Sequence, residues 1–351
     1  SNSPAYREQV KDVKVGVTQV HLRNAQFLGL QIPLPPLAEQ TIIAQTLDTL
    51  LAQVDNIKTR LDAIPNILKT FRQSVLAAAV SGKLTEAWRG DIAVYDEVTG
   101  WYLAKDWALE EFKSLAKFID YRGKTPKKVE AGTPLITAKN IKDGYINREP
   151  REYISNEDYE PWMTRGIPRI KDVLITTEAP LGNVALIDIK EKFALAQRAI
   201  CLQFHDIELG PCMALFMRSL PFKEKLLAEA TGTTVKGIKA SKLKLIVLPV
   251  PPLEEQTQIV NRVEELFAFA DQIEQQVKNA QGRVNNLTQS ILAKAFRGEL
   301  TTQWRAENPD LISGENSAEA LLAKIQEERE KLKPKKKATR KKATAKKTVK
   351  R

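Results

Sequence analysis

The chain has 351 residues, with 54 Lys and Arg against 43 Asp and Glu, and a formal net charge of +11. It contains neither an apolar run of membrane-spanning length nor a signal peptide, so we expect a cytoplasmic protein without a membrane partner. The two cysteines, Cys201 and Cys212, stand in apolar segments without metal-ligand spacing. This pattern favours buried free thiols over a disulfide or a zinc site.

The excess positive charge lies at the C-terminus. Residues 333–351 hold eleven Lys or Arg and no acid, which leaves 43 basic and 43 acidic residues in the rest of the chain. This tract has too few apolar residues to build a core, so we expect a disordered basic tail. Residues 101–245 have 24 basic against 19 acidic side chains, and residues 246–332 have 9 against 14. A phosphate-binding face is therefore expected in the middle segment.

The beginning of the chain repeats a later segment. Residues 14–32 match residues 230–248 at an offset of 216 positions, and the match continues without a gap through Arg89 and Arg305. Roughly a third of the paired positions are identical, which a duplicated structural unit explains. We therefore expect residues 1–32 to be the tail end of a truncated first domain. Its body is missing either through truncation or because the protein is a natural half-size form.

Two long helices are predicted, one in residues 33–90 and its repeat copy in residues 249–305. Proline is tolerated only in the first turn of a helix, and glycine often forms the left-handed cap at its end. The starts are accordingly marked by Pro36 and Pro252, and the ends by Gly82 and Gly298.

Apolar residues recur in both helices at alternating steps of three and four, a pattern typical of a coiled-coil seam. The first copy has Ile43, Leu47, Leu50, Val54, Ile57, Leu61, Ile64, Leu68, Phe71 and Val75, and the second has Ile259, Val263, Leu266, Ala270, Ile273, Val277, Ala280, Val284, Leu287 and Ile291. Since the copies are equivalent, we expect them to pair with each other as an antiparallel coiled coil. Pairing between two chains, as a homodimer, is the second option.

Residues 91–248 have a different pattern, with short β-branched runs separated by turn residues. The strand-like runs are Pro134–Thr137, Val173–Thr177, Val184–Ile187 and Ala199–Phe204. Residues 213–230 predict a helix pair, or one helix interrupted at Pro221. The expected fold class is α+β, with one mixed α/β domain and two long helices. Residues 306–332 add a short charged C-terminal helix.

The sequence resembles the specificity subunit of type I restriction-modification systems. The likeness rests on the two proline-led motifs PLPPLAEQ (33–40) and PVPPLEEQ (249–256), the helix ends GKLT (82–85) and GELT (298–301), and the closing TGTTVKGI (231–238) of the middle domain. It covers nearly everything from residue 14 to about residue 305.

This resemblance implies a protein without catalysis or a cofactor of its own. In the family, two target-recognition domains each read one half of a bipartite site in double-stranded DNA, and the two helices form a spacer between them. Methyltransferase (modification) subunits dock on this scaffold, and a restriction subunit supplies ATP-dependent translocation and cleavage. Because most of the first recognition domain is missing here, one copy of this chain is expected to read one half-site.

Several polar segments of the middle domain are candidates for DNA contact. The first is a basic loop with an aromatic residue, containing Tyr121, Arg122, Lys124 and Thr125. Its Arg and Lys side chains suit phosphates or a guanine edge. The alternative is an ordinary solvated loop. The segment is not a P-loop, because its glycine spacing does not match Walker A.

Further candidates follow predicted strands, where loops often carry function. They are Lys139, Asn140, Thr177 and Asn183, with Thr233, Thr234 and Lys236 in the later loop. For Lys139, Asn140, Thr177 and Asn183, the alternative is that their segments only form turns. Arg198 is expected to brace the domain or to touch DNA.

A second class of function remains open from the residues alone. No methylation motif, glycine-rich cofactor loop or nuclease carboxylate cluster is recognisable. A coiled-coil adaptor that assembles partner proteins and binds DNA non-specifically through its basic tail is the alternative.

Overall fold

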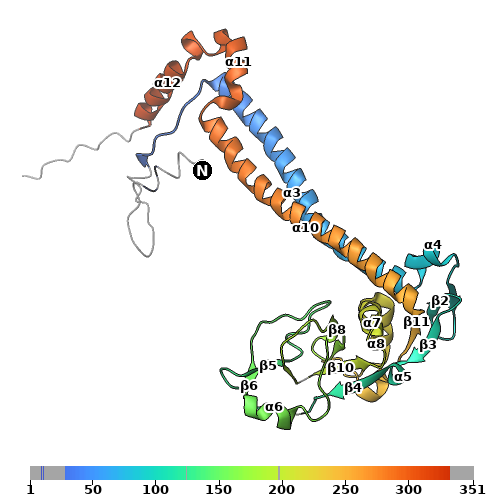
Figure 1. Cartoon of the computed structure of the whole chain (residues 1–351). Helices are drawn as coiled ribbons and strands as arrows, with labels where there is room; N and C mark the ends of the chain where they lie inside the picture. Colours follow the sequence, from blue (N-terminus) through green and yellow to red (C-terminus); the bar gives the residue numbers. More distant parts are fainter. Residues whose placement is uncertain (1–8, 10, 12–27, 124, 197, 333–351) are drawn as a thin grey trace, which may run out of the picture. The chain divides into compact units, whose positions relative to one another are not determined.

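The structure is a computed structural model that describes residues 9, 11, 28–123, 125–196 and 198–332 (Figure 1). Most of the expected first-domain remnant, Lys124 and the basic tail lie outside the described residues. The chain divides into two units, one made of residues 1–63 and 277–351 and the other of residues 64–276. The division falls inside both long helices. None of the described helices is long and apolar enough to cross a membrane.

The two predicted helices are present with the expected ends. Helices α3 (Leu37–Val80) and α10 (Leu253–Phe296), both labelled in Figure 1, each have 44 residues. They begin directly after Pro36 and Pro252. Gly82 and Gly298 follow them with φ of 69° and 73°, in the left-handed region that favours glycine.

In the first unit, the contacts show that the two helices run in opposite directions. The Nε2 of Gln281 donates to Oδ1 of Asp62 at 2.8 Å. Nearer the start of α3, Glu39 accepts a hydrogen bond from Thr301, which follows α10, at 2.5 Å. As the residue number rises from 39 to 62 in α3, the number of the partner residue falls from 301 to 281. These segments therefore pair antiparallel.

The second unit has the same antiparallel pairing. Nη2 of Arg72 lies 2.6 Å from Oδ1 of Asp271 and 3.2 Å from Oε2 of Glu274. Among all predicted seam positions only Ile57 and Leu287 are exposed, at 44% and 42%. The apolar repeat therefore forms an antiparallel coiled-coil seam, and the prediction is confirmed.

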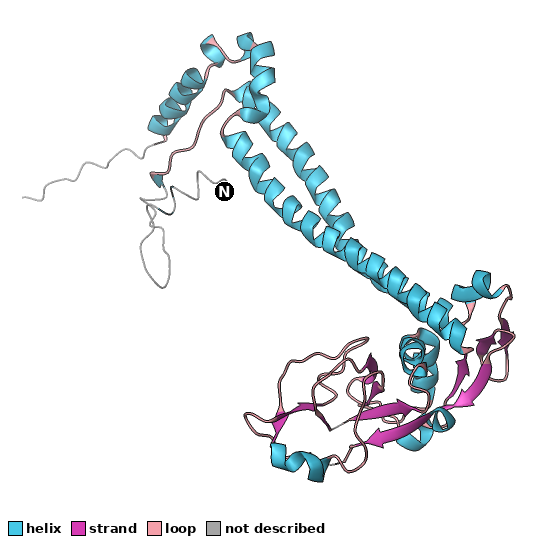
Figure 2. Cartoon of the chain, viewed as in Figure 1, coloured by secondary structure: helices cyan, strands magenta, loops and turns pink. Residues whose placement is uncertain are grey.

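The domain in the second unit is built on a four-stranded antiparallel sheet in the order β4-β10-β7-β8. Figure 2 draws the strands of this domain in magenta. Its strands are β4 (Ala116–Asp120), β10 (Ala199–Phe204), β7 (Val173–Thr177) and β8 (Leu181–Leu186). The pairing places Ile200 opposite Asp120, and Ala199 opposite Thr176. The end of β4, the start of β10 and the end of β7 consequently meet at one edge.

This sheet is buried on both faces, and alternate side chains enter different clusters. Val173 and Ile175 pack on the side of α7 (Leu209–Arg218). Leu174 and Cys201 pack with a second sheet of order β6-β5-β9. The elements of that side are β5 (Thr133–Ile136), β6 (Tyr153–Ile154), β9 (Ala194–Leu195) and α6 (Asn156–Trp162). Both cysteines are buried and free, as predicted.

The remaining helices and strands lie around the main sheet or after α10. They are α4 (Glu86–Arg89), β1 (Val94–Asp96), β2 (Trp101–Leu103), β3 (Ala108–Glu111), α5 (Phe112–Leu115), α8 (Leu220–Ala228), α9 (Ala240–Leu243) and β11 (Val247–Val250), with α11 (Thr302–Glu307) and α12 (Ala318–Lys331) in the other unit. The break between α7 and α8 is at Ser219, which caps α8, whereas Pro221 occupies the first turn of that helix. The predicted helix pair is therefore present, and its break lies two residues before Pro221.

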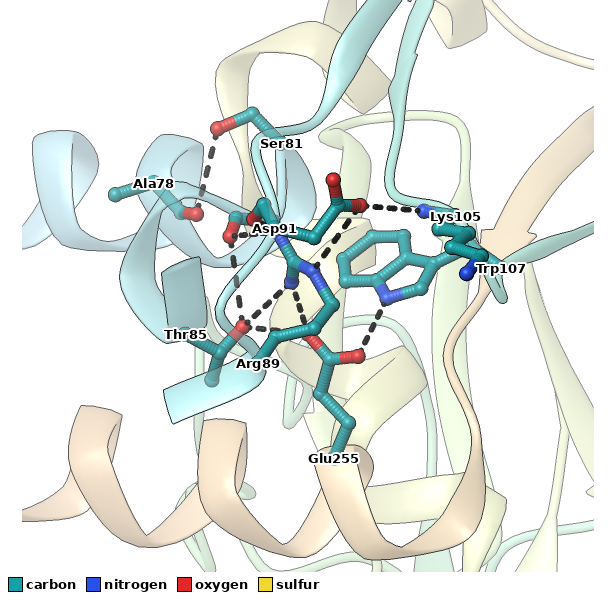
Figure 3. A network of polar contacts seen from close by, with 9 residues as sticks. Ala78, Ser81, Thr85, Arg89, Asp91, Lys105, Trp107 and Glu255 are labelled. Atoms are coloured by element: carbon teal, nitrogen blue, oxygen red, sulfur yellow. Dashed lines mark hydrogen bonds and ion pairs between the residues drawn. The ribbon is translucent and has the colours of Figure 1, made fainter. Parts of the chain in front are cut away.

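A polar clasp joins the domain to both helices within the second unit (Figure 3). The carboxylate of Glu255, which is 2% exposed, accepts from Oγ1 of Thr85 at 2.6 Å and from Nη1 of Arg89. Its other oxygen accepts from the indole Nε1 of Trp107 at 2.8 Å. One buried carboxylate on α10 therefore connects the end of α3 and the first strands of the domain.

Candidate nucleic-acid interface

Four loops converge at one edge of the four-stranded sheet. Three of them contain the end of β4, the start of β10 and the end of β7, which the strand pairing brings together. The fourth is the segment 231–238, whose Ile238 N–H donates to the carbonyl of Thr177 at 3.0 Å. This site, called the loop edge below, collects several of the predicted DNA-contact residues.

At the end of β4, Arg122 is held by Asp120. Its Nε and Nη2 donate to the two carboxylate oxygens of Asp120 at 2.8 and 2.7 Å, and Nη1 donates to the carbonyl of Ile238 at 3.2 Å. Burial acts to raise the pKa of Asp120, but the hydrogen bonds from Arg122 and the charges of Arg122 and Arg165 outweigh burial and lower that pKa. Asp120 therefore stays ionised and keeps the guanidinium fixed beside the fourth loop.

Tyr121 is buried, with 3% exposure. Its hydroxyl donates to the carbonyl of Gly166 at 2.9 Å and accepts from the N–H groups of Arg165 at 2.7 Å and Gly166 at 3.1 Å. The guanidinium of Arg165 lies 5.8 Å from the centre of the Tyr121 ring. The structure thus gives Tyr121 a supporting position under a basic side chain. Thr125 in the same loop is exposed.

Thr177 at the end of β7 is 1% exposed and holds the start of β10. Its N–H and Oγ1 both donate to the carbonyl of Arg198, at 2.9 and 3.2 Å. The side chain of Arg198 points back to the same loop, with Nε 3.2 Å from Oε1 of Glu178. Thr177 is consequently a buried support for the loop edge.

The segment 231–238 forms a closed turn against β7. Thr231 and Gly237 exchange backbone hydrogen bonds of 2.8 and 2.9 Å, and Gly237 also bridges to Glu178. Gly232 has a φ of 105°, and a Cβ there would lie 2.2 Å from the carbonyl oxygen of Val235, so the turn requires glycine. The predicted residues Thr233, Thr234 and Lys236 are exposed on this turn.

Two other candidates lie on the turn after β5. Asn140 is 1% exposed, and its amide oxygen accepts from the N–H and Oγ1 of Thr137 at 3.0 and 3.1 Å. Its amide nitrogen donates to the carbonyls of Asn147 and Pro150, both at 3.1 Å. The side-chain amide of Asn140 therefore has hydrogen-bond partners within the protein at both its oxygen and its nitrogen. Lys139 is 68% exposed, and its Nζ lies 3.7 Å from Glu152.

Asn183 connects that turn to the main sheet. Its Nδ2 donates to the carbonyl of Ile141 at 2.9 Å, and its N–H donates to Oγ1 of Thr176 at 2.9 Å. The structure brings several of the predicted loops together, but the side chains of Tyr121, Asn140, Thr177 and Asn183 form hydrogen bonds within the protein. The turn-forming alternative describes Asn140, whereas Asn183 lies within strand β8.

The sequence gives Arg165 no role, and it leaves open whether Arg198 braces the domain or touches DNA. Both side chains are exposed. Arg198 belongs to the loop edge, and Arg165 contacts it through Tyr121. Their only sequence signal is a basic residue beside a predicted strand or turn.

Comparison with known proteins identifies the class to which this architecture belongs. The family model of the type I restriction modification DNA specificity domain matches residues 5–66 and 104–280. The chain is 43% identical over 335 residues to the type I restriction enzyme EcoBI specificity subunit of Escherichia coli, covering 93% of this chain and 70% of that protein. It is 40% identical over 341 residues to the EcoKI specificity subunit of E. coli K12, with coverage of 94% and 70%. This chain belongs to the type I restriction-modification DNA specificity family.

Two solved structures share the fold at 21% sequence identity. One, with a TM-score of 0.60, comes from work on complex assembly and conformational transition of the type I R-M system, and the alignment covers 85% of this chain and 69% of that one. The other is the HsdS subunit of Thermoanaerobacter tengcongensis, with a TM-score of 0.55 and coverage of 85% and 68%.

Proposed function

We propose that this chain is the DNA sequence-reading subunit of a type I restriction-modification complex, and that its middle domain reads one half of a bipartite site through the loop edge. Family membership supports the class of function. The observation that carries the site is the convergence of Arg122, Arg198 and Lys236 on loops that share one edge of the sheet. Arg165 lies on a neighbouring loop and contacts Tyr121.

The exposed and buried residues of the loop edge take different parts in this proposal. We assign DNA contact to the exposed residues, which are Arg165, Arg198, Thr233, Thr234 and Lys236. Tyr121 and Thr177 hold the loops in position from below. Basic side chains position the domain on phosphates, and a smaller number of contacts to base edges select the sequence. Lys139, exposed on the turn after β5, is a further candidate phosphate contact.

The helices and the remaining subunits complete the proposed complex. The coiled coil acts as the spacer between half-site readers and as the docking scaffold for methyltransferase subunits and a restriction subunit. The chain itself is non-catalytic in this account. A complete bipartite reader then requires a second recognition domain, from a longer form of the chain or from a second copy in a homodimer.

Removal of the basic tail separates this proposal from the adaptor alternative. We expect the chain without residues 333–351, purified with its methyltransferase subunits, to keep sequence-selective binding in a selection from randomised duplexes. Its affinity for all sequences falls and its salt dependence becomes weaker, because tail phosphate contacts are lost. Loss of all DNA binding on removal of the tail would favour the adaptor.

A single lysine provides the matched test of the loop edge. We expect Lys236→Ala to weaken binding to every duplex by a similar factor and to reduce the salt slope by about one counterion. Lys192→Ala is the control, since that lysine is paired with Glu160 and lies beside α6. Equal effects of the two substitutions would contradict the proposed location of the site.

A further inference from the structure

Arg198 has an unusual backbone conformation. Its φ is +59°, and the other described non-glycine residues with positive φ are Lys171 and Ala179. Ala179, at +42°, belongs to the loop that follows β7, directly beside Arg198. Left-handed backbone is unfavourable for residues with a Cβ and persists where surrounding contacts impose it. Two such residues on adjacent loops mark this part of the loop edge as a constrained position.

The backbone contacts that impose this conformation come from buried groups. The carbonyl of Arg198 accepts two hydrogen bonds from Thr177, which is 1% exposed. The carbonyl of Thr177 in turn accepts from the N–H of Ile238 at 3.0 Å. Arg198 is therefore tied to β7 and, through it, to the turn of residues 231–238. Its Cα has a fixed place on the sheet while its side chain projects outward.

The side chain itself is exposed and weakly bound. It is 58% exposed, and its one described ionic partner, Glu178, is 45% exposed at an Nε to Oε1 distance of 3.2 Å. An exposed ion pair contributes little to stability. Stability of the domain thus does not explain why an arginine occupies a left-handed position that glycine or asparagine would adopt more easily.

We propose that Arg198 is a specificity-determining residue that reads a guanine within the half-site, with Glu178 as the positioning residue that orients its guanidinium before DNA binds. This inference rests on the proposed function. The planar fork of arginine matches the O6 and N7 acceptors of guanine. A phosphate fits this position less well, because the carboxylate of Glu178 lies beside the guanidinium and repels an anion, whereas the guanine edge is neutral.

Two substitutions test the guanine contact. Arg198→Asn removes the guanidinium and tolerates the left-handed backbone, so the loop keeps its shape. Arg198→Lys keeps the positive charge without the bidentate fork. Arg148→Ala is the matched control, because Arg148 is also an exposed arginine in an ion pair, with Glu191, outside the loop edge. Each full-length variant is purified with the methyltransferase subunits and used in a selection from randomised duplexes.

We expect both Arg198 variants to lose discrimination at one G·C base pair by about 5- to 150-fold, with the other preferred positions unchanged. Arg148→Ala keeps the full preference. Uniform weakening across all sequences would show a phosphate contact, and an unchanged preference would show a bracing residue, and either result overturns the proposal. Full discrimination by Arg198→Lys would also overturn it. If the unmodified complex selects no sequence, the proposed function itself fails.

Discussion

The same three-residue contact occurs at both ends of the duplicated helices. In the second unit, Thr85 and Arg89 donate to Glu255. In the first unit, residues 216 positions away make the equivalent contact: Thr301 donates to Oε1 of Glu39 at 2.5 Å, and Arg305 donates to the same oxygen. The sequence duplication is thus reproduced as a duplicated polar clasp.

The two clasps differ in what surrounds them. Only Glu255 accepts a hydrogen bond from a described indole, that of Trp107. Seam residues beside it, such as Ile259 and Val263, are fully buried, whereas their repeat equivalents Ile43 and Leu47 are half-buried. The helix pair therefore makes the Glu, Thr and Arg contact in both units. In the second unit, the recognition domain adds the indole hydrogen bond and the apolar side chains that cover the contact.

Substitution of the two clasp carboxylates is expected to give the largest difference between the units in the free energy of unfolding. Glu255→Ala removes the close carboxylate partner of Arg89, which is only 7% exposed, and leaves it the carboxylate of Asp91 at 4.0 Å. We expect a loss of about 3 to 5 kcal/mol in the free energy of unfolding. Glu39→Ala should cost about 1 to 2 kcal/mol, because Arg305 is 33% exposed and reaches water. Urea denaturation measures both, and equal losses would contradict the comparison.

The indole contact is tested by a smaller change. Trp107→Phe removes the donor to Glu255 and keeps a ring against Phe216, whose centre lies 5.8 Å from that of Trp107. We expect a loss of about 1 to 3 kcal/mol, since one buried carboxylate oxygen is left without a partner. Trp304→Phe is the control in the other unit. A stability as high as that of the unmodified chain would show that the indole hydrogen bond is dispensable.

The smallest expected effect is on the reactivity of the Cys212 thiol, near the clasp of the second unit. Burial, and then the charge of Glu255, raise the pKa of Cys212 far above its ordinary value. A raised thiol pKa keeps the group protonated through the neutral and mildly alkaline range, so alkylation by iodoacetamide from pH 7 to 9 should stay slow. Mass spectrometry should detect faster labelling of Cys212 in Trp107→Phe and an unchanged rate in Glu39→Ala. Rapid labelling of the unmodified chain would contradict the described burial.

Local sequence patterns predicted the elements that depend on neighbouring residues. The seam, the helix starts after Pro36 and Pro252, and the strands at Val173–Thr177 and Ala199–Phe204 follow from periodicity and turn chemistry. The buried position of Tyr121 depends on contacts 45 residues away, and the left-handed backbone of Arg198 depends on Thr177. Such long-range contacts have no local signature, so the sequence indicated loops of the candidate site but not which of their side chains are buried.

The central claim is that the middle domain reads one half of a bipartite DNA site. Its most direct test is to replace residues 101–248 by the corresponding domain of a relative with a different site, in cells that carry the complete restriction-modification system. Long-read sequencing of methylated adenines then gives the recognised motif. We expect one half of the motif to change to that of the donor while the other half and the spacer stay the same. An unchanged motif would contradict the account.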